Sequence, residues 1–104
     1  MTDKRLDQVR KRIERIKAEL AAIADMRPGS LSRQYKDPAR QHGAYFQLSY
    51  THQMKSRTEY VARACIGDVR REIRNYKRFK ALTGEWIALS IEHSRLKIKR
   101  ARKR

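Results

Sequence analysis

The sequence predicts an α+β fold that is predominantly helical, with two long antiparallel helices and a two-stranded β-hairpin inserted between them (α-β-β-α). Apolar residues recur at helical spacing in residues 2–26 and 64–99, and they alternate in residues 44–62. A chain of 104 residues, of which 39% are hydrophobic, is expected to form a single domain with a thin core.

Residues 2–26 carry a heptad seam. Its apolar residues follow alternating steps of three and four: Leu6, Val9, Ile13, Ile16, Leu20 and Ile23. Thr2 or Asp3 can cap the first turn, and Pro28 disfavours helical geometry at Arg27, which ends the helix. A helix of this length is marginal alone, because nucleation is costly and the seam would face water. It is therefore expected to pack against a second helix.

Residues 64–99 form the predicted second helix. The apolar stripe consists of Ile66, Val69, Ile73, Tyr76, Phe79, Leu82, Trp86, Leu89, His93 and Leu96. Gly84 costs about 1 kcal/mol relative to alanine in a helix interior, so the pattern allows a kink near residues 83–84. The stripe resumes at once with Trp86. The simplest architecture is an antiparallel pair of helices.

The segment between the helices contains the predicted hairpin. Residues 27–43 read as a loop, and residues 44–62 read as two strands around a polar turn at residues 52–56. Two strands alone are barely stable. One face, with Phe46, Leu48 and Tyr50, is therefore expected to lie against the helices, and Tyr45 and Gln47 are expected on the other face.

The charge balance points to a polyanionic partner. The chain has 27 Lys and Arg against 11 Asp and Glu, a formal net charge of +16, and nucleic acid would screen this charge. A membrane surface is the weaker alternative, because a surface-lying helix needs neither a hairpin nor a second long helix. The N-terminus is charged and no apolar stretch could span a bilayer. We therefore expect a cytoplasmic protein without membrane contact.

The residues typical of catalytic and metal sites are missing from the pattern. Cys65 is the only cysteine, so the sequence allows no intrachain disulfide and no cysteine-based zinc site. His42, His52 and His93 are widely spaced, and the sequence shows no nucleophile motif and no phosphate-binding glycine loop. We therefore expect a non-enzymatic protein without a cofactor.

The second helix and the C-terminal tail supply candidate phosphate contacts. On the helix, spacings of three and four bring Arg70, Arg74, Lys77 and Arg78 close to one face, and arginine binds phosphate bidentately. Residues 97–104 form a basic tail with Lys97, Lys99, Arg100, Arg102, Lys103 and Arg104. Such a run is either a disordered, solvated segment or one that orders on phosphates.

The predicted hairpin supplies a second kind of contact. Lys55 and Arg57 lie near its tip, and Tyr45 and Gln47 lie on its outer face. A two-stranded ribbon fits the major groove of DNA, and an exposed tyrosine can stack on an unpaired base. The plainer alternative is that the tyrosines only cover the helices.

The middle of the chain resembles a family of small prokaryotic proteins of unknown function that are often associated with transposons. The shared elements are PGSLSRQY, HGAYFQLSYT with Lys55 and Arg57, TEYV, and a helix containing VRREIRNYKRFKAL, within residues 28–90. Many relatives carry a cysteine knuckle between the first two elements, whereas residues 35–41 of this chain have no cysteine. Ala44 stands where proline is usual.

These patterns leave three hypotheses. The first is an accessory protein that binds DNA, with a mobile-element or recombination context implied only by the resemblance. The second is an RNA-binding subunit of a ribonucleoprotein complex. The third is a helical adaptor that binds another protein. A homodimer is compatible with each hypothesis, because a second chain would cover the remaining apolar surface of the helices.

Overall fold

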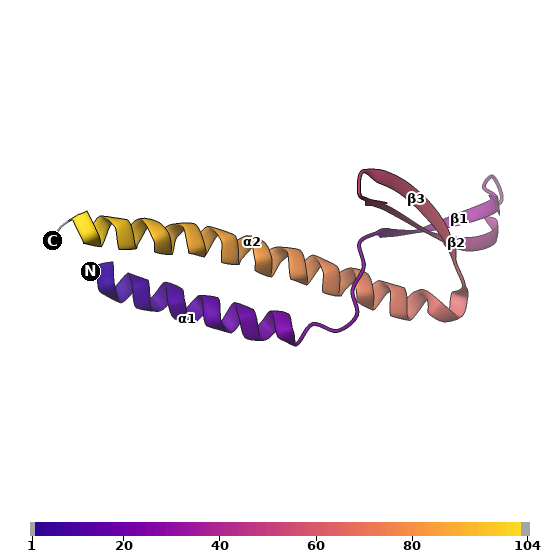
Figure 1. The fold of residues 1–104 in the computed structure, drawn as a ribbon. Coiled ribbons are helices and arrows are strands. Elements are labelled where there is room, and N and C mark those ends of the chain that lie inside the picture. The colour runs from indigo at the N-terminus through magenta and orange to yellow at the C-terminus, as the bar shows by residue number, and fades with distance from the viewer. Residues whose placement is uncertain (1, 103–104) are drawn as a thin grey trace. The chain divides into compact units, whose positions relative to one another are not determined.

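The structure is a computed structural model and describes residues 2–102. Its elements are α1 (Thr2–Ala21), β1 (Ser30–Asp37), β2 (His42–His52), β3 (Lys55–Val61), the short 3-10 helix η1 (Arg63–Cys65) and α2 (Ile66–Arg102) (Figure 1). Two compact units divide the chain: a helical unit of residues 1–23 and 78–104, and a sheet unit of residues 24–77. The mixed α+β class is confirmed, but the sheet has three strands rather than two.

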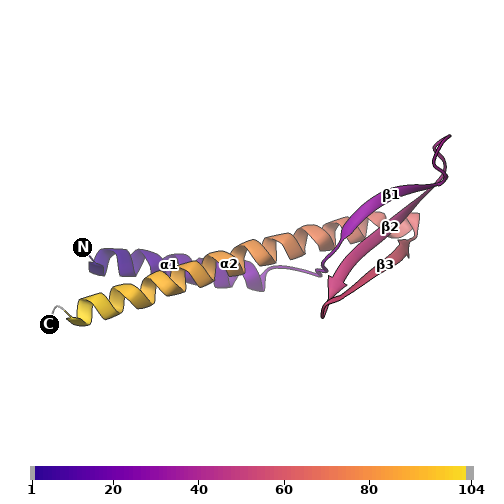
Figure 2. The same ribbon diagram turned by 90° about the horizontal axis from the view of Figure 1, so that it is seen from above.

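The helical unit pairs α1 with the C-terminal part of α2. The two helices run side by side in opposite directions in Figure 1, and α1 passes behind α2 in the view of Figure 2. Leu6, Val9 and Ile16 of the predicted heptad seam are buried, together with Leu82 of α2. The predicted packing of the seam against a second helix is therefore confirmed.

Helix α1 ends at Ala21, earlier than residue 26. The N–H of Ala22 donates to the carbonyls of both Ala18 and Glu19, and the N–H of Ile23 donates to Leu20 at 3.1 Å. Bonds that span three residues instead of four tighten the last turn and end the helix.

Helix α2 continues through Thr83 and Gly84 to Arg102. The hydroxyl of Thr83 donates to the carbonyls of Phe79 and Lys80, at 2.9 and 3.1 Å. A disordered segment is one alternative that the sequence allows for the basic tail. That alternative does not describe residues 97–102, which are helical. These residues are good helix formers, and cations are favourable at a helix C-terminus. Lys103 and Arg104 lie outside the described residues.

The sheet unit contains an antiparallel sheet in the order β1-β2-β3 (Figure 2). The expectation of a loop over residues 27–43 is wrong, because Ser30–Asp37 forms β1. This strand pairs with β2 from Ser30 opposite Ser49 to Asp37 opposite His42. Its own alternation is weak, and pairing along its whole length with β2 supplies the backbone hydrogen bonds that stabilise it.

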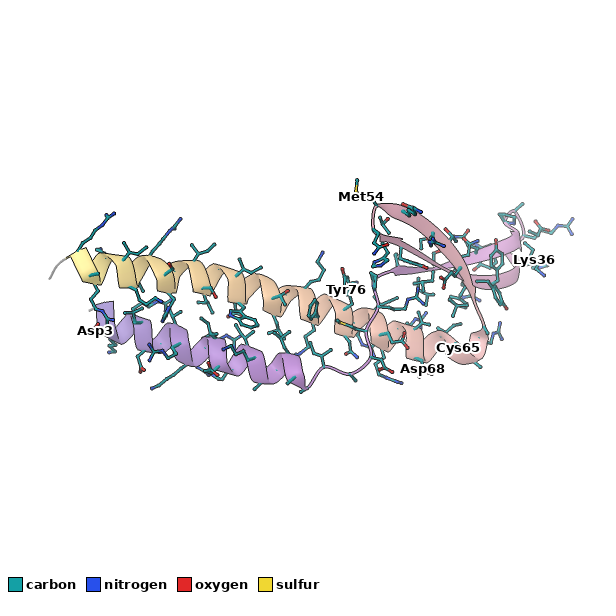
Figure 3. All side chains as sticks on the ribbon, in the orientation of Figure 1. Asp3, Lys36, Met54, Cys65, Asp68 and Tyr76 are labelled. Atoms are coloured by element: carbon teal, nitrogen blue, oxygen red, sulfur yellow. The ribbon has the colours of Figure 1, made fainter. Side chains whose placement is uncertain are left out.

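The predicted β-hairpin corresponds to β2 and β3 and is confirmed. A two-residue turn of Gln53 and Met54 joins the strands, with His52 opposite Lys55. Both turn residues have positive φ, 51° and 64°, as in the type I′ turn that suits the twist of a hairpin. Met54 is 98% exposed and points away from the end of the ribbon (Figure 3).

The core of the sheet unit lies between one face of the sheet and the first turns of α2. Leu48, Val61 and Ile73 are buried. Partly buried side chains complete the cluster: Leu31, Phe46, Tyr50, Ile66 and Val69. The prediction that Phe46, Leu48 and Tyr50 form the buried face of the hairpin is therefore confirmed.

The segment before β1 is fixed to this core. The N–H of Arg27 donates to the carbonyl of Glu72 at 3.2 Å, and the side-chain amide of Asn75 donates to the carbonyl of Asp25 at 2.8 Å. At Gly29, φ is +150° and a Cβ would lie 2.5 Å from Leu48 Cδ1. Glycine therefore allows the backbone to pass directly over the most buried side chain of the sheet.

Candidate nucleic-acid interface

One face of the sheet carries only polar side chains. Residues that pair directly across two strands share a face, so the register places one set of side chains on the side opposite α2: Ser30, Ser32, Gln34 and Lys36 of β1, Tyr45, Gln47, Ser49 and Thr51 of β2, and Ser56, Thr58 and Tyr60 of β3. We call this set the open face. The buried cluster of the unit lies entirely on the other side of the sheet.

Hydrogen bonds on the open face connect hydroxyl and amide groups. The side-chain amide of Gln34 donates to the hydroxyl of Ser32 at 3.2 Å. The hydroxyls of Thr51 and Ser56, which are cross-strand partners, are 3.0 Å apart. Amides and hydroxyls both donate and accept hydrogen bonds, which is the chemistry that recognises the edges of base pairs.

A row of three cations on α2 lies beside the start of β1. Arg70, Arg74 and Lys77 line a groove of about 290 Å³ together with Gly29, Ser30, Leu31 and Ile73. The guanidinium of Arg70 also lies 5.9 Å from the centroid of the Phe46 ring. All three cations are exposed and form no ion pair within the described residues. We call them the cation row.

The other flank of this part of α2 carries acidic residues. Asp68, Arg71, Glu72 and Asn75 line a hollow with Asp25. The Arg71 guanidinium is 3.2 Å from the Asp68 carboxylate, so it is neutralised locally. The charges of α2 in the sheet unit are therefore divided, with the cation row on one flank and the carboxylates of Asp68 and Glu72 on the other.

Arg78 differs from the cation row because it has an acidic partner. Arg78 belongs to the helical unit and lies 3.9 Å from the carboxylate of Glu19 on α1. Spacing along α2 groups Arg78 with Arg74 and Lys77, but its acidic partner comes from a distant part of the sequence.

Lys55 and Arg57 lie at the free end of the ribbon, opposite His52 and Tyr50. They are exposed and form no ion pair among the residues that the structure describes. Because they share the side of Tyr50, they lie on the opposite side of the sheet from Tyr45 and Gln47. The hairpin therefore presents its predicted charges and its predicted stacking and amide groups on different sides.

The C-terminal cations lie on α2 in the helical unit. Arg100 Nη1 is 2.8 Å from the carboxylate of Asp3. Lys97, Lys99 and Arg102 are exposed and have no ion pair within residues 2–102. These three side chains form a second basic surface, which is separate in the chain from the cation row.

Two arginine–glutamate pairs join the helices of the helical unit. Arg12 donates two hydrogen bonds of 2.7 Å to Glu85, and Arg5 donates to Glu92 through both Nε and Nη2. Hydrogen bonds from the guanidinium groups lower the pKa of both glutamates, against a smaller opposing effect of burial. The same bonds raise the pKa of Arg5 and Arg12.

His93 lies on the packed stripe of α2, as predicted. It is half-buried, and its Nε2 atom is buried without a hydrogen-bond partner in the described part of the chain. Burial lowers its pKa, with smaller contributions from Lys97, Arg10 and Arg100. Its surroundings are therefore those of a neutral packed histidine.

One exposed stripe of α2 in the helical unit is apolar. Ile87, Ile91 and Ile98 are exposed, Ile87 by 63%. With Thr83, Trp86, Ser90, Ser94 and Arg95, the first two of these line a groove of about 750 Å³. The spacing of the isoleucines fits the heptad repeat of a helix that packs on another helix.

Lys36 and Tyr60 are among the residues of the open face that sequence reasoning missed. Lys36 lay in a segment interpreted as loop, and Tyr60 was assigned to a strand but not to a site. The alternation of Ser30, Ser32 and Gln34 was the available signal for β1. Placing Lys36 and Tyr60 on one face with Tyr45 additionally requires the register of three strands.

Neither a metal-ligand cluster nor a membrane-spanning helix is found among residues 2–102. Among residues 2–102, no group of three or more His, Cys, Asp or Glu side chains is arranged to hold a metal ion. No helix in this part of the chain combines the length and apolar character needed to cross a membrane. No protein family, curated protein or solved structure matches the chain.

Proposed function

We propose that this protein binds duplex DNA as a non-enzymatic accessory factor, with the open face in the major groove and basic side chains on the flanking phosphates. The proposal includes a mobile-element or recombination context, which only the family resemblance supports. The observation that carries the proposal is that the sheet unit combines a sheet face of polar side chains with cations, at both edges of the sheet, that have no acidic partner within residues 2–102.

The dimensions of the sheet support groove binding. Neighbouring strands lie about 4.8 Å apart, so the backbones of three strands span about 10 Å. The major groove is about 12 Å wide and admits elements of this size. Gln34, Gln47 and the hydroxyls of the open face would meet base edges, and an amide recognises adenine bidentately.

The cations lie at both margins of the sheet. The cation row is next to the start of β1, an edge strand. Lys55 and Arg57 lie on β3, the other edge strand. Both groups lie on the side of the sheet opposite the open face, so in the proposed complex they reach around the two sheet edges to the phosphate backbones that border the groove. Phosphate contacts fix register and orientation, while base contacts specify sequence.

RNA is the second candidate ligand. The exposure of Tyr60, 71%, favours it, because RNA-binding sheets use aromatic side chains to stack on unpaired bases. The deep, narrow major groove of an RNA duplex excludes a sheet, so the two candidates predict opposite preferences between duplex DNA and single-stranded RNA.

The experiment is an anisotropy titration of labelled duplex DNA at several salt concentrations, with single-stranded and duplex RNA as competitors. We expect binding that weakens steeply with salt, by a log–log slope of about 0.9 for each phosphate contact. The triple variant Arg70→Gln/Arg74→Gln/Lys77→Gln should lower both the affinity and the slope.

A charge-matched variant on α1, Lys4→Gln/Arg10→Gln/Arg15→Gln, provides the control. It removes the same number of positive charges from exposed positions of the helical unit. Equal losses in both variants would show that only total charge matters and would reject the proposed interface. Stronger competition by single-stranded RNA than by duplex DNA would favour the RNA alternative.

A further inference from the structure

A hollow of about 540 Å³ lies at the end of the open face next to the β1–β2 turn. Lys36, Gly43, Ala44, Tyr45 and Tyr60 line it. Each of the three strands contributes to this lining, and Figure 3 places Lys36 at the same end of the sheet.

The register sets the spacing of the two tyrosines. Tyr60 pairs with Gln47, so Tyr45 is its diagonal neighbour on the same face. Diagonal neighbours are about 7–8 Å apart. Atoms of stacked rings are in contact at about 3.5 Å, so a backbone separation of this size can hold one planar ring between two parallel tyrosine rings.

Glycine at position 43 determines where Lys36 lies. Gly43 has φ +71°, and a Cβ there would meet the Cβ, Cγ and Cδ of Lys36 at 3.0, 3.3 and 3.4 Å. The aliphatic part of Lys36 therefore lies across the glycine, beside the tyrosines. A cation at this point can reach the phosphate of a nucleotide whose base lies between the rings.

We propose that this hollow binds one unpaired nucleobase of a DNA strand, stacked between Tyr45 and Tyr60, with Lys36 on its phosphate. This inference rests on the proposed DNA-binding function and adds a structural preference to it. A sheet that only covered a helix would not require an aromatic ring on its far side that is 71% exposed. The ligand recognised in this way is a DNA duplex with an extruded or bulged base.

The test compares two DNA duplexes of the same sequence, one fully paired and one with a single bulged 2-aminopurine. Stacking on tyrosine should quench the 2-aminopurine fluorescence on addition of the intact protein. Base–aromatic stacking should make the bulged duplex bind about 5- to 100-fold more tightly than the paired one.

Variants of Tyr60 make the test specific. Tyr60→Leu should abolish both the quenching and the preference for the bulge, so that this variant binds the bulged and the paired duplex with equal affinity. Tyr60→Phe keeps the ring and should retain both effects. Thr51→Val, which changes the same face near the other end of β2, should retain both the quenching and the preference for the bulge.

The outcomes separate this inference from the proposed function. Equal affinity for bulged and paired DNA, or quenching that persists in Tyr60→Leu, would overturn the stacking site and leave DNA binding intact. Absence of binding to both duplexes at low salt would overturn the proposed function itself. A preference for the same bulge in RNA over DNA would overturn the assignment to DNA.

Discussion

The guanidinium of Arg27 lies over the ring of Tyr50, 4.9 Å from the ring centroid. The same guanidinium is 3.6 Å from the carboxylate of Glu59, to which the Tyr50 hydroxyl donates a hydrogen bond of 2.6 Å. This bond raises the pKa of Tyr50. The three side chains fix the segment that enters β1 to the middle and last strands of the sheet.

Replacing Arg27 should destabilise the sheet unit. Arg27→Ala removes the cation–π contact and the ion pair, and we expect a loss of about 1–2 kcal/mol in the free energy of unfolding. Urea unfolding followed by circular dichroism measures this loss. Arg63→Ala, at an exposed position without an ion pair in residues 2–102, is the control. Equal stability of the two variants would contradict a structural role for Arg27.

Acid should destabilise the helical unit in two steps. A group whose pKa is lower in the folded than in the unfolded state stabilises the fold above its ordinary pKa, and this contribution is lost as the pH falls. The lowered pKa of His93 predicts a first loss below about pH 6.5, and the lowered pKa values of Glu85 and Glu92 predict a second below about pH 4.3.

The fluorescence of Trp86 can follow this unfolding, because Trp86 is the only tryptophan and packs in the helical unit under Lys17, 5.5 Å from its ring centroid. Glu85→Gln should reduce the second loss. Asp7→Asn, whose only described ion pair is with Lys11 on the same helix, should reduce it less. An unchanged acid profile in Glu85→Gln would exclude the pair with Arg12 as a source of acid sensitivity.

Substitutions in the turn between β2 and β3 should stabilise the ribbon. Left-handed geometry costs about 1–2 kcal/mol for residues other than glycine and asparagine, and both Gln53 and Met54 adopt it. Gln53→Asn/Met54→Gly should slow amide hydrogen exchange in the ribbon. Faster exchange in Gln53→Asn/Met54→Gly would contradict the geometry of the β2–β3 turn.

Gly43→Ala should accelerate exchange near the β1–β2 turn, because it places a Cβ at φ +71° against Lys36.

The exposed isoleucines of α2 predict self-association of the protein. A second chain packed on Ile87, Ile91 and Ile98 would remove apolar surface from water. Sedimentation should therefore show a dimer at high concentration that Ile87→Gln/Ile91→Gln disrupts. Ala81→Gln, at another exposed position of the helix, is the control. A monomer at all concentrations would exclude this surface as a homodimer interface.

The sequence predicted the elements whose periodicity is strong. The heptad seam of α1 and the stripe of α2 fall on buried or half-buried positions, and Leu48 is at the centre of the predicted hairpin face. Strand β1 was missed because Leu31 and Tyr35 are its only large apolar residues. Its strand geometry depends on pairing with β2, a long-range contact that local propensity does not encode.

The candidate interface was predictable to a similar extent. Helical spacing grouped Arg70, Arg74 and Lys77 correctly, because residues three and four apart share a helix face. It also grouped Arg78 with them, but it could not show that Arg78 has a partner, Glu19, on another helix. The placement of Tyr60 beside Tyr45 required the register between β2 and β3.

The division of charge across α2 gives the sheet unit a dipole moment. Its positive side is the flank with the cation row, and its negative side is the flank with Asp68 and Glu72. The electric field of a polyanion would orient the sheet unit before the two molecules make contact, with the carboxylates turned away from the polyanion. Encounters would therefore begin in one preferred orientation, and dilute salt would accelerate association more than it slows release.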